Sequence, residues 1–337
     1  MNQEKTPATA GFWMPAEWAI HERCWMAWPC RQEAWPTNIN LETIRAAYAD
    51  VAQSIAAFEP VTMVAHPQDA DNAAHMLGGA AEVLPLPIDD SWLRDNGPTF
   101  LVSDAGECAG IDWQFNAWGN KYHSYSADNA VAGHILQHLQ LHRFVAPLVM
   151  EGGSFHTDGE GTLLITEQCQ LNPNRNPHLS RADIEAYLRN YLGAKKIIWL
   201  AGNTYDEETD GHVDNAACFT AAGTVLAMQD DNDALLQENI RRLHNATDAE
   251  GRQLRVLTLP RPPICKRDDF APASYINFYL ANGGVIMPSF GIKEDDTAHS
   301  IIAEAFPNRK ITSVPANVIV AGGGGIHCIT QQQPAGN

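Results

Sequence analysis

Hydrophobic and polar positions recur along the chain with two periods, one typical of helices and one of buried strands. Over residues 37–58, Ile44, Tyr48, Val51 and Ile55 recur at three- to four-residue spacing, which predicts an amphipathic helix. The apolar run Val61–Ala65 follows and predicts a short buried strand. A helix that precedes a strand in this way indicates an α/β protein.

The same alternation continues toward the C-terminal end. Ser180 and Asp183 form the pattern of a capping box before a helix that carries Ile184, Tyr187, Leu188 and Leu192 and ends at Gly193. Further helices are predicted at 234–243 and 297–306, and strands at 196–200, 216–219, 224–228, 254–259, 275–280 and 317–320. No linker, charge block or low-complexity segment divides the chain, so we expect a single α/β domain.

Composition and charge narrow the class of protein. The chain has 337 residues, 45% of them apolar, which is enough to bury a large core. Its net charge of −18 argues against binding to nucleic acid or an anionic membrane, and it favours small cations as ligands. Residues 1–10 form a polar tail without the apolar core of a secretory signal, and no stretch approaches the roughly 20 apolar residues of a membrane helix. We therefore expect a cytoplasmic protein.

The seven cysteines form an odd set without CxxC spacing, which predicts reduced thiols. Cys328 stands out because it follows four glycines in Ala321-Gly-Gly-Gly-Gly-Ile-His-Cys328. Glycines let the backbone and a ligand approach closely, so this thiol is a candidate nucleophile. The alternative is a buried structural cysteine, which is the common fate of a free Cys.

A thiol reacts as the thiolate and needs a nearby base or cation to ionise at neutral pH. His212 is the candidate base, in Glu207-Glu-Thr-Asp-Gly-His-Val-Asp-Asn-Ala216. Nearby carboxylates hold a proton on histidine, which suits a general acid. Asp214, two residues further on, is expected on the same face of a strand as His212.

Three acidic residues, Asp95, Glu151 and Asp214, each lie beside glycine or turn residues at the edge of an apolar run. The successive intervals Asp95 to Glu151, Glu151 to His212 and His212 to Cys328 are 56, 61 and 116 residues, close to one, one and two multiples of about 60. This spacing fits five similar supersecondary units around one centre. If the acids converge, several anions surround one thiol and need a cation. A guanidinium, planar and with five N–H donors, is a suitable ligand; the alternative for each acid alone is a solvated turn residue.

Six ordered motifs resemble agmatine deiminases, within the wider agmatine and peptidyl-arginine deiminase family. They are Trp92-Leu-Arg-Asp-Asn-Gly-Pro98, Phe115-Asn-Ala-Trp-Gly119, Glu151-Gly-Gly-Ser-Phe-His156, Glu208-Thr-Asp-Gly-His-Val-Asp-Asn215, Ala273-Ser-Tyr-Ile-Asn-Phe-Tyr279 and Gly322-Gly-Gly-Gly-Ile-His-Cys-Ile-Thr-Gln331. The resemblance implies a five-bladed pseudo-symmetric α/β propeller, the pentein fold, formed by one domain at residues 11–334 after the polar tail at 1–10.

The resemblance also implies roles for individual residues. Cys328 matches the family nucleophile, His212 the acid/base, and Asp95, Glu151 and Asp214 the carboxylates around the guanidinium. Trp92 and Glu208 match positions near the substrate. The implied reaction converts agmatine to N-carbamoylputrescine and ammonia through a covalent amidino-cysteine, with no metal or organic cofactor. The chain departs from the family at Gly325, where members often have Asn, and this puts the order of the nucleophile loop in question.

Several alternatives stay open at this point. One is deimination of arginine or peptidyl-arginine, because the basic stretch Cys265-Lys-Arg267 could face a substrate carboxylate. Another is a metal-dependent amidohydrolase with His212, Asp214 and either His327 or Cys328 as ligands, and His134, His138 and His142 also recur four apart, as on one helix face. A third is a non-catalytic polyamine binder. The sequence does not exclude a homo-oligomer.

Overall fold

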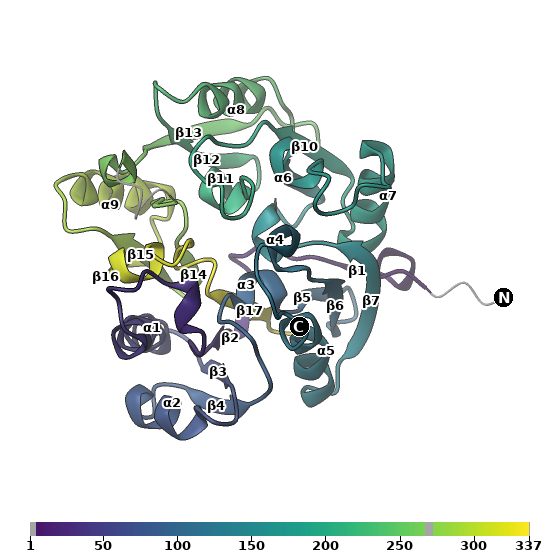
Figure 1. Ribbon diagram of the computed structural model, residues 1–337. Helices are drawn as coiled ribbons and strands as arrows, with labels where there is room; N and C mark the ends of the chain where they lie inside the picture. Colours follow the sequence, from purple (N-terminus) through teal and green to yellow (C-terminus); the bar gives the residue numbers. More distant parts are fainter. Residues whose placement is uncertain (1–4, 267–271, 337) are drawn as a thin grey trace.

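Five β-sheets lie around a common centre in the computed structural model, which describes residues 5–266 and 272–336 (Figure 1). The first sheet contains β1 (Phe12–Trp13), β5 (Thr99–Ser103), β6 (Cys108–Gln114) and β7 (His142–Val149). The next three contain β8 (Phe155–Thr157), β9 (Thr162–Thr166) and β10 (Lys196–Leu200); β11 (Ala217–Ala221), β12 (Thr224–Gln229) and β13 (Arg255–Pro260); and β14 (Tyr279–Ala281), β15 (Gly284–Ser289) and β16 (Lys310–Pro315). The last contains β17 (Thr330–Pro334), β2 (His21–Ala27), β3 (Val61–Ala65) and β4 (Glu82–Pro85).

The same unit recurs in each sheet. An antiparallel pair is followed by a parallel neighbour, as in β11 with β12 and then β12 with β13. Parallel neighbours need a crossover connection, and a helix lies in each one. These helices are α1 (Leu41–Ala56), α5 (Asp128–His138), α7 (Arg181–Leu192), α8 (Ala234–His244) and α9 (Glu294–Ala305); α2 (Ala70–Leu77) lies in the extra crossover to β4.

The two ends of the chain close the ring of sheets. The C-terminal strand β17 pairs antiparallel with β2, with Gln332 opposite Cys24. A buried contact joins this sheet to the sheet of β14. The Tyr279 hydroxyl in β14 donates to Glu59 at 2.5 Å, and Glu59 also contacts His21 Nδ1 in β2 at 3.1 Å. Distant parts of the sequence are therefore held side by side.

The apolar pattern of the sequence forms the core. Strands β3 and β9 are buried at every position, and α1 turns Ile44, Tyr48 and Ile55 inward. Fully burying a side chain of this size contributes about 1.5–3 kcal/mol. The sheets are consequently rigid supports for the polar turns at their ends.

Most predicted elements are confirmed. Strands β3 and β10 have the predicted bounds, and α8, β11, β12 and β13 match within a few residues. The capping box of α7 is present, and Gly193 ends the helix with φ 73°. Helix α1 begins at Leu41 instead of residue 37, because the Asn40 side chain accepts the N–H of Thr43 and caps it there.

Local predictions at three places away from His212 are wrong. Residues 317–320 form helix α10 (Asn317–Val320), in which Val320 N–H donates to Ala316 O at 2.9 Å; a short apolar run cannot distinguish a strand from a helical turn. The strand predicted at 275–280 begins only at Tyr279, because the preceding residues form tight turns such as Asn277 N–H to Ser274 O at 3.3 Å. His142 lies in β7, so it does not share a helix face with His134 and His138.

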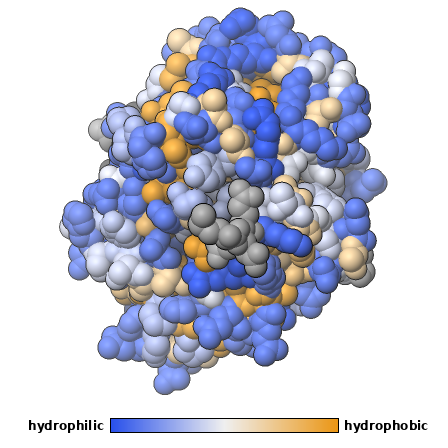
Figure 2. All heavy atoms as spheres, turned by 90° about the vertical axis from the view of Figure 1, so that its right-hand side faces the viewer, coloured by the Kyte–Doolittle hydropathy of each residue, from blue (hydrophilic) through white to orange (hydrophobic). Residues whose placement is uncertain are grey.

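The polar surface and the free cysteines were both expected from the sequence. On the face in Figure 2 hydrophilic residues predominate, and apolar residues form only short stretches. None of the helices in the described part of the chain is long and apolar enough to cross a membrane. The cysteines at 24, 30, 108, 169, 218 and 328 are free thiols.

Candidate active site

Connections of the chain between sheets carry polar side chains to one common centre. Five connections do so, and each lies between two sheet strands: Asp95 (β4 to β5), Glu151 (β7 to β8), His212 and Asp214 (β10 to β11), Asn277 (β13 to β14) and Cys328 (β16 to β17). All six side chains are buried. The structure therefore brings together the five residues predicted as catalytic, and it adds Asn277 from the remaining connection.

Asp95 lies in the short helix α3 (Leu93–Asn96) and is held from two sides. Gly153 N–H donates to its Oδ1 at 2.9 Å, and the indole N–H of Trp118 donates to its Oδ2 at 2.8 Å. Trp118 belongs to α4 (Ala117–Asn120), a left-handed turn in which Ala117 and Trp118 both have φ 52°. This backbone costs about 1–2 kcal/mol per non-glycine residue, so the surrounding structure stabilises an unfavourable turn that aims Trp118 at Asp95.

Glu151 precedes a short turn, Gly152–Ser154, and is paired with a buried arginine. Arg175 Nε donates to Glu151 Oε1 at 2.6 Å, and the same guanidinium donates to Asp210 and to the carbonyl of Thr209. Burial acts to raise the pKa of Glu151, but Arg175 and His212 bring it below its ordinary value. Glu151 is therefore a stable carboxylate.

His212 lies between two of the carboxylates. Its Nδ1 is 3.7 Å from Asp95 Oδ1 and its Nε2 is 3.8 Å from Glu151 Oε2. Burial acts to lower the pKa of His212, but Asp95, Cys169 and Glu151 raise it by more, to well above its ordinary value. The predicted strand around His212 is wrong: Val213–Asn215 forms a 3-10 helix, which turns His212 and Asp214 into the site without a shared strand face.

Asp214 is held by a second histidine. His327 Nδ1 lies 2.9 Å from Asp214 Oδ2, and His327 Nε2 lies 2.9 Å from Glu17 Oε1. Burial and Arg94 act to lower the pKa of His327, but the two carboxylates raise it above its ordinary value. Burial acts to raise the pKa of Asp214, and the hydrogen bond from His327 brings it below its ordinary value. His327 therefore acts as a buried cation that keeps Asp214 ionised.

The Cys328 sulfur lies between the carboxylate of Asp214 and the side-chain amide of Asn277. Its Sγ is 3.5 Å from Asp214 Oδ2 and 3.2 Å from Asn277 Nδ2. Burial raises the pKa of the Cys328 thiol well above its ordinary value, and Asp214 and Asp95 raise it further. The thiol is therefore protonated at neutral pH until a cation enters the site.

A narrow cavity leads to this sulfur from the surface. Among the predicted residues, Trp92, Asp95, Glu208 and Cys328 line it. A wider outer pocket shares Tyr122, Glu208, Gly322 and Gly323 with the cavity, so the two form one path. Trp92 stacks on Trp35 with ring centroids 5.6 Å apart, which fixes its ring in the cavity wall. Glu151, His212 and Asp214 lie behind this lining.

Several buried polar atoms at the inner end, two carboxylate oxygens and two ring nitrogens, have no hydrogen-bond partner in the described part of the protein. Glu151 Oε2, Asp214 Oδ1 and both ring nitrogens of His212 are buried without a hydrogen-bond partner among the described residues. A Cβ at Gly153 would lie 2.8 Å from His212 Nδ1 and 2.9 Å from both Asp214 Oδ2 and Asp95 Oδ1, so these groups face one gap. Buried acceptors of this kind are costly unless a ligand donates to them.

The alternative of a metal-dependent amidohydrolase is disfavoured by the positive charge of Arg175 beside the possible metal ligands. Within the described part of the chain, the group that could hold a metal is Glu151, Cys169 and His212, with ligand atoms within 4.8 Å of one another. Arg175 is ion-paired with Glu151 at 2.6 Å, and its guanidinium opposes a second cation there. The ligand set considered from the sequence, His212 and Asp214 with His327 or Cys328, does not form such a group.

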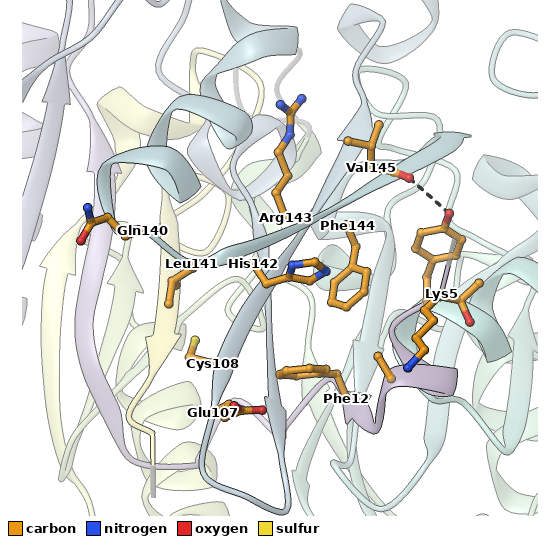
Figure 3. Close-up of a pocket in the computed structure, with 13 residues that line it drawn as sticks. Lys5, Phe12, Glu107, Cys108, Gln140, Leu141, His142, Arg143, Phe144 and Val145 are labelled. Atoms are coloured by element: carbon orange, nitrogen blue, oxygen red, sulfur yellow. Dashed lines mark hydrogen bonds between the residues drawn. The ribbon is translucent and has the colours of Figure 1, made fainter. Parts of the chain in front are cut away.

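Another pocket lies beside β7 and contains none of the predicted site residues (Figure 3). Phe12 and Phe144 pack edge to face there, with ring centroids 5.7 Å apart. The Tyr191 hydroxyl donates to the Val145 carbonyl at 3.2 Å. This pocket offers aromatic walls but no convergent buried polar groups.

Sequence reasoning missed four residues of the site. Asn277 and Trp118 lie within quoted motifs, so the motifs held the signal without showing which side chain turns inward. His327 was considered only as a metal ligand, and Arg175 carried no pattern that distinguishes it from a surface arginine. Arg267, in the basic stretch considered for arginine binding, lies outside the described residues.

Comparison with known proteins gives matches over nearly the whole chain. The model of the Porphyromonas-type peptidyl-arginine deiminase family matches residues 13–334. A Legionella pneumophila protein provisionally named as an agmatine deiminase is 50% identical, over 99% of this chain and 98% of the relative. The agmatine deiminase of Pseudomonas aeruginosa is 44% identical, over 99% and 98%. A solved structure of Enterococcus faecalis agmatine deiminase is 37% identical with a TM-score of 0.95, over 99% of both chains. The chain therefore belongs to the Porphyromonas-type peptidyl-arginine deiminase family.

Proposed function

We propose that this protein is an agmatine deiminase, which hydrolyses agmatine to N-carbamoylputrescine and ammonia. The observation that carries the proposal is the pair of buried, unpartnered carboxylate oxygens on Glu151 and Asp214, beside His212 and the Cys328 thiol. Full-length relatives that are named agmatine deiminases support the same reaction. A guanidinium satisfies this geometry because it carries five N–H donors in one plane.

In this proposal Asp95 and Asp214 hold the guanidinium, and Glu151 accepts a further N–H. The positive charge of the substrate lowers the pKa of the Cys328 thiol, which burial and the carboxylates otherwise raise. As the substrate enters, the S–H proton is released to solvent along the path, and the remaining thiolate attacks the substrate. The Sγ forms a bond to the guanidino carbon and gives a tetrahedral adduct.

His212 then acts as the general acid. Its raised pKa keeps it protonated, so it donates a proton to the departing nitrogen and ammonia leaves as the C–N bond breaks. A covalent amidino-cysteine remains. Neutral His212 next takes a proton from water, the hydroxide attacks the amidino carbon, and the C–S bond breaks to release the ureido product and the thiol.

The cavity favours agmatine over arginine. None of the described residues that line the inner cavity is basic, and Glu208 supplies a carboxylate where the path widens. We assign Glu208 to the distal ammonium of agmatine and Trp92 to the wall along its methylene chain. Arginine would place its own carboxylate toward Glu208, which is unfavourable.

We also propose that the five sheets form a pentein fold. We assign residues 11–334 to one pentein domain, a pseudo-symmetric propeller of five blades, with residues 1–10 as a tail outside it. The support is the recurrent unit of an antiparallel pair, a helix and a parallel strand in every sheet.

Parallel assays test the substrate. Ammonia and ureido product are measured with agmatine, free arginine and an arginine peptide, for the wild type and for Cys328→Ser. We expect turnover of agmatine alone, and none in Cys328→Ser, because a hydroxyl is not ionised by the same surroundings. Preferred turnover of arginine or the peptide would reassign the substrate, and an active Cys328→Ser variant would remove Cys328 from the mechanism.

A further inference from the structure

The side chain of Asn277 reaches the sulfur of Cys328 in a fixed orientation. Asn277 is fully buried, and its Oδ1 accepts the backbone N–H of His327 at 2.9 Å and of Cys328 at 3.3 Å. Backbone N–H groups only donate, so the amide oxygen faces the loop. The NH2 group therefore faces Cys328 Sγ at 3.2 Å and Asn215 Oδ1 at 3.0 Å.

The Asn277 side chain occupies space beside residue 325 that is free because this residue is glycine. A Cβ at residue 325 would lie 2.3 Å from Asn277 Oδ1 and 2.7 Å from the amide carbon. Gly325 is not among the glycines with positive φ, whereas Gly323 in the same loop has φ 103°. A Cβ at residue 325 would therefore collide with the Asn277 side chain as it lies in this structure, whereas φ at residue 325 does not require glycine.

Asn277 acts on the pKa of the Cys328 thiol in the opposite direction to the two nearby carboxylates. Burial, Asp214 and Asp95 raise the pKa of the Cys328 thiol, whereas the Gly325 N–H and the Asn277 amide act to lower it. A hydrogen bond to a charged acceptor is about twice as strong as one to a neutral acceptor, so the amide favours the ionised sulfur.

We propose that the Asn277 amide stabilises the thiolate of Cys328, and that Gly325 leaves this amide its position, because in this structure a Cβ at residue 325 would displace it. When the S–H proton leaves, the N–H of Asn277 remains as a donor to the sulfur. The inference rests on the proposed function only in taking Cys328 as the nucleophile. It makes Asn277 a catalytic residue, since it touches the reacting atom.

The test measures ionisation of the thiol without using the substrate. Alkylation of Cys328 by iodoacetamide is followed across pH by mass spectrometry of its peptide, in the wild type, Asn277→Asp and Gly325→Ala. Asn277→Asp keeps the acceptor for the loop but replaces the donor by oxygen, and Gly325→Ala displaces the amide without adding charge. In both variants we expect the ionisation midpoint to move to higher pH, with alkylation at neutral pH about tenfold slower.

Two matched controls separate this effect from general damage. Asn239 is buried and bonded in the same way, accepting from Ala201 N–H at 2.7 Å and donating to Gly202 O at 2.7 Å, so Asn239→Asp is the control for the first variant. At Gly133 an added Cβ meets the flexible end of Arg143, so Gly133→Ala is the control for the second. Neither control should move the midpoint.

The outcomes decide between the two proposals. An unchanged midpoint in folded Asn277→Asp and Gly325→Ala overturns the role of Asn277, even if agmatine turnover falls. Circular dichroism identifies the folded variants, and Asn277→Ser replaces either one that does not fold. If the midpoint moves as expected but the wild type turns over neither agmatine, arginine nor the arginine peptide, the effect of the amide on the thiol stands and the proposed function fails.

Discussion

Arg175 donates from Nε to the Glu151 carboxylate at 2.6 Å, with both side chains buried. This ion pair keeps Glu151 charged beside His212, and the same guanidinium holds the carbonyl of Thr209 three residues before that histidine. A residue that contacts no substrate thus positions two groups that do in the proposed mechanism.

The first prediction concerns this pair. Arg175→Met should raise the pKa of Glu151, which Arg175 now holds below its ordinary value. A carboxylate with a higher pKa becomes protonated at a higher pH, so the acid limb of the pH profile of kcat/KM should move upward. Arg175→Lys, which keeps the charge without the planar fork, should restore part of the activity.

The control for this prediction is an exposed arginine. Arg181 pairs with Glu167 at 3.0 Å on the surface, so Arg181→Met should leave the profile unchanged. An acid limb that stays in place in active Arg175→Met would show that Glu151 does not depend on this pair.

The second prediction concerns the indole of Trp118. Trp118→Phe removes the N–H that donates to Asp95 at 2.8 Å but keeps an aromatic ring against Phe115. A hydrogen bond to a charged group contributes about 1.5–3 kcal/mol, so kcat/KM for agmatine should fall roughly ten- to a hundredfold. Trp113→Phe is the matched control, because Trp113 donates to Thr99 at 2.9 Å away from the site; equal losses in both variants would contradict the assigned role.

The third prediction concerns Gly153. A methyl group there would lie within 2.9 Å of His212, Asp214 and Asp95, so at least one of them must move. Displacement of a reacting group by about 1 Å can cost a hundredfold in rate, and we expect Gly153→Ala to lose at least that much in kcat. Steady-state kinetics together with a melting curve check this, and full activity in the folded variant would show that the gap does not receive the substrate.

The fourth prediction concerns stability and pH. Asp128 Oδ1 accepts the N–H of Asp89 at 2.8 Å, and burial with the neighbouring Asp90 raises the pKa of Asp128 to about 8. An unfolded aspartate has a pKa near 3.9, so between about pH 4 and 8 the folded state holds a proton that the unfolded state has lost. The free energy of unfolding should therefore fall as pH rises through this range.

Asp128→Asn removes this dependence, because an amide oxygen accepts the same N–H groups without ionising. Denaturant unfolding at pH 9 should show the variant to be more stable than the wild type by on the order of 3 kcal/mol.

Asp248 is the opposite case. Burial acts to raise the pKa of Asp248, but Arg252 brings it below its ordinary value, so Asp248→Asn should destabilise the protein. Equal effects of the two substitutions would contradict this account.

The sequence by itself determined the class, the family and most regular elements. Its helical and strand periods depend on local geometry, which is why β3, β10 and the capping box of α7 were predicted with correct bounds. The six ordered motifs predicted the family, which the match over residues 13–334 confirms. The roles of Cys328, His212, Asp95, Glu151 and Asp214 stay predictions.

Only the tertiary structure decided which polar side chains meet and what charge each one carries. Asn277 and Cys328 are far apart in the sequence, and the closure of five sheets places their side chains 3.2 Å apart. Whether an arginine is a surface residue or the buried partner of Glu151 also depends on packing, because burial and the nearest charge together set each pKa. These are long-range quantities, and no local pattern of residues encodes them.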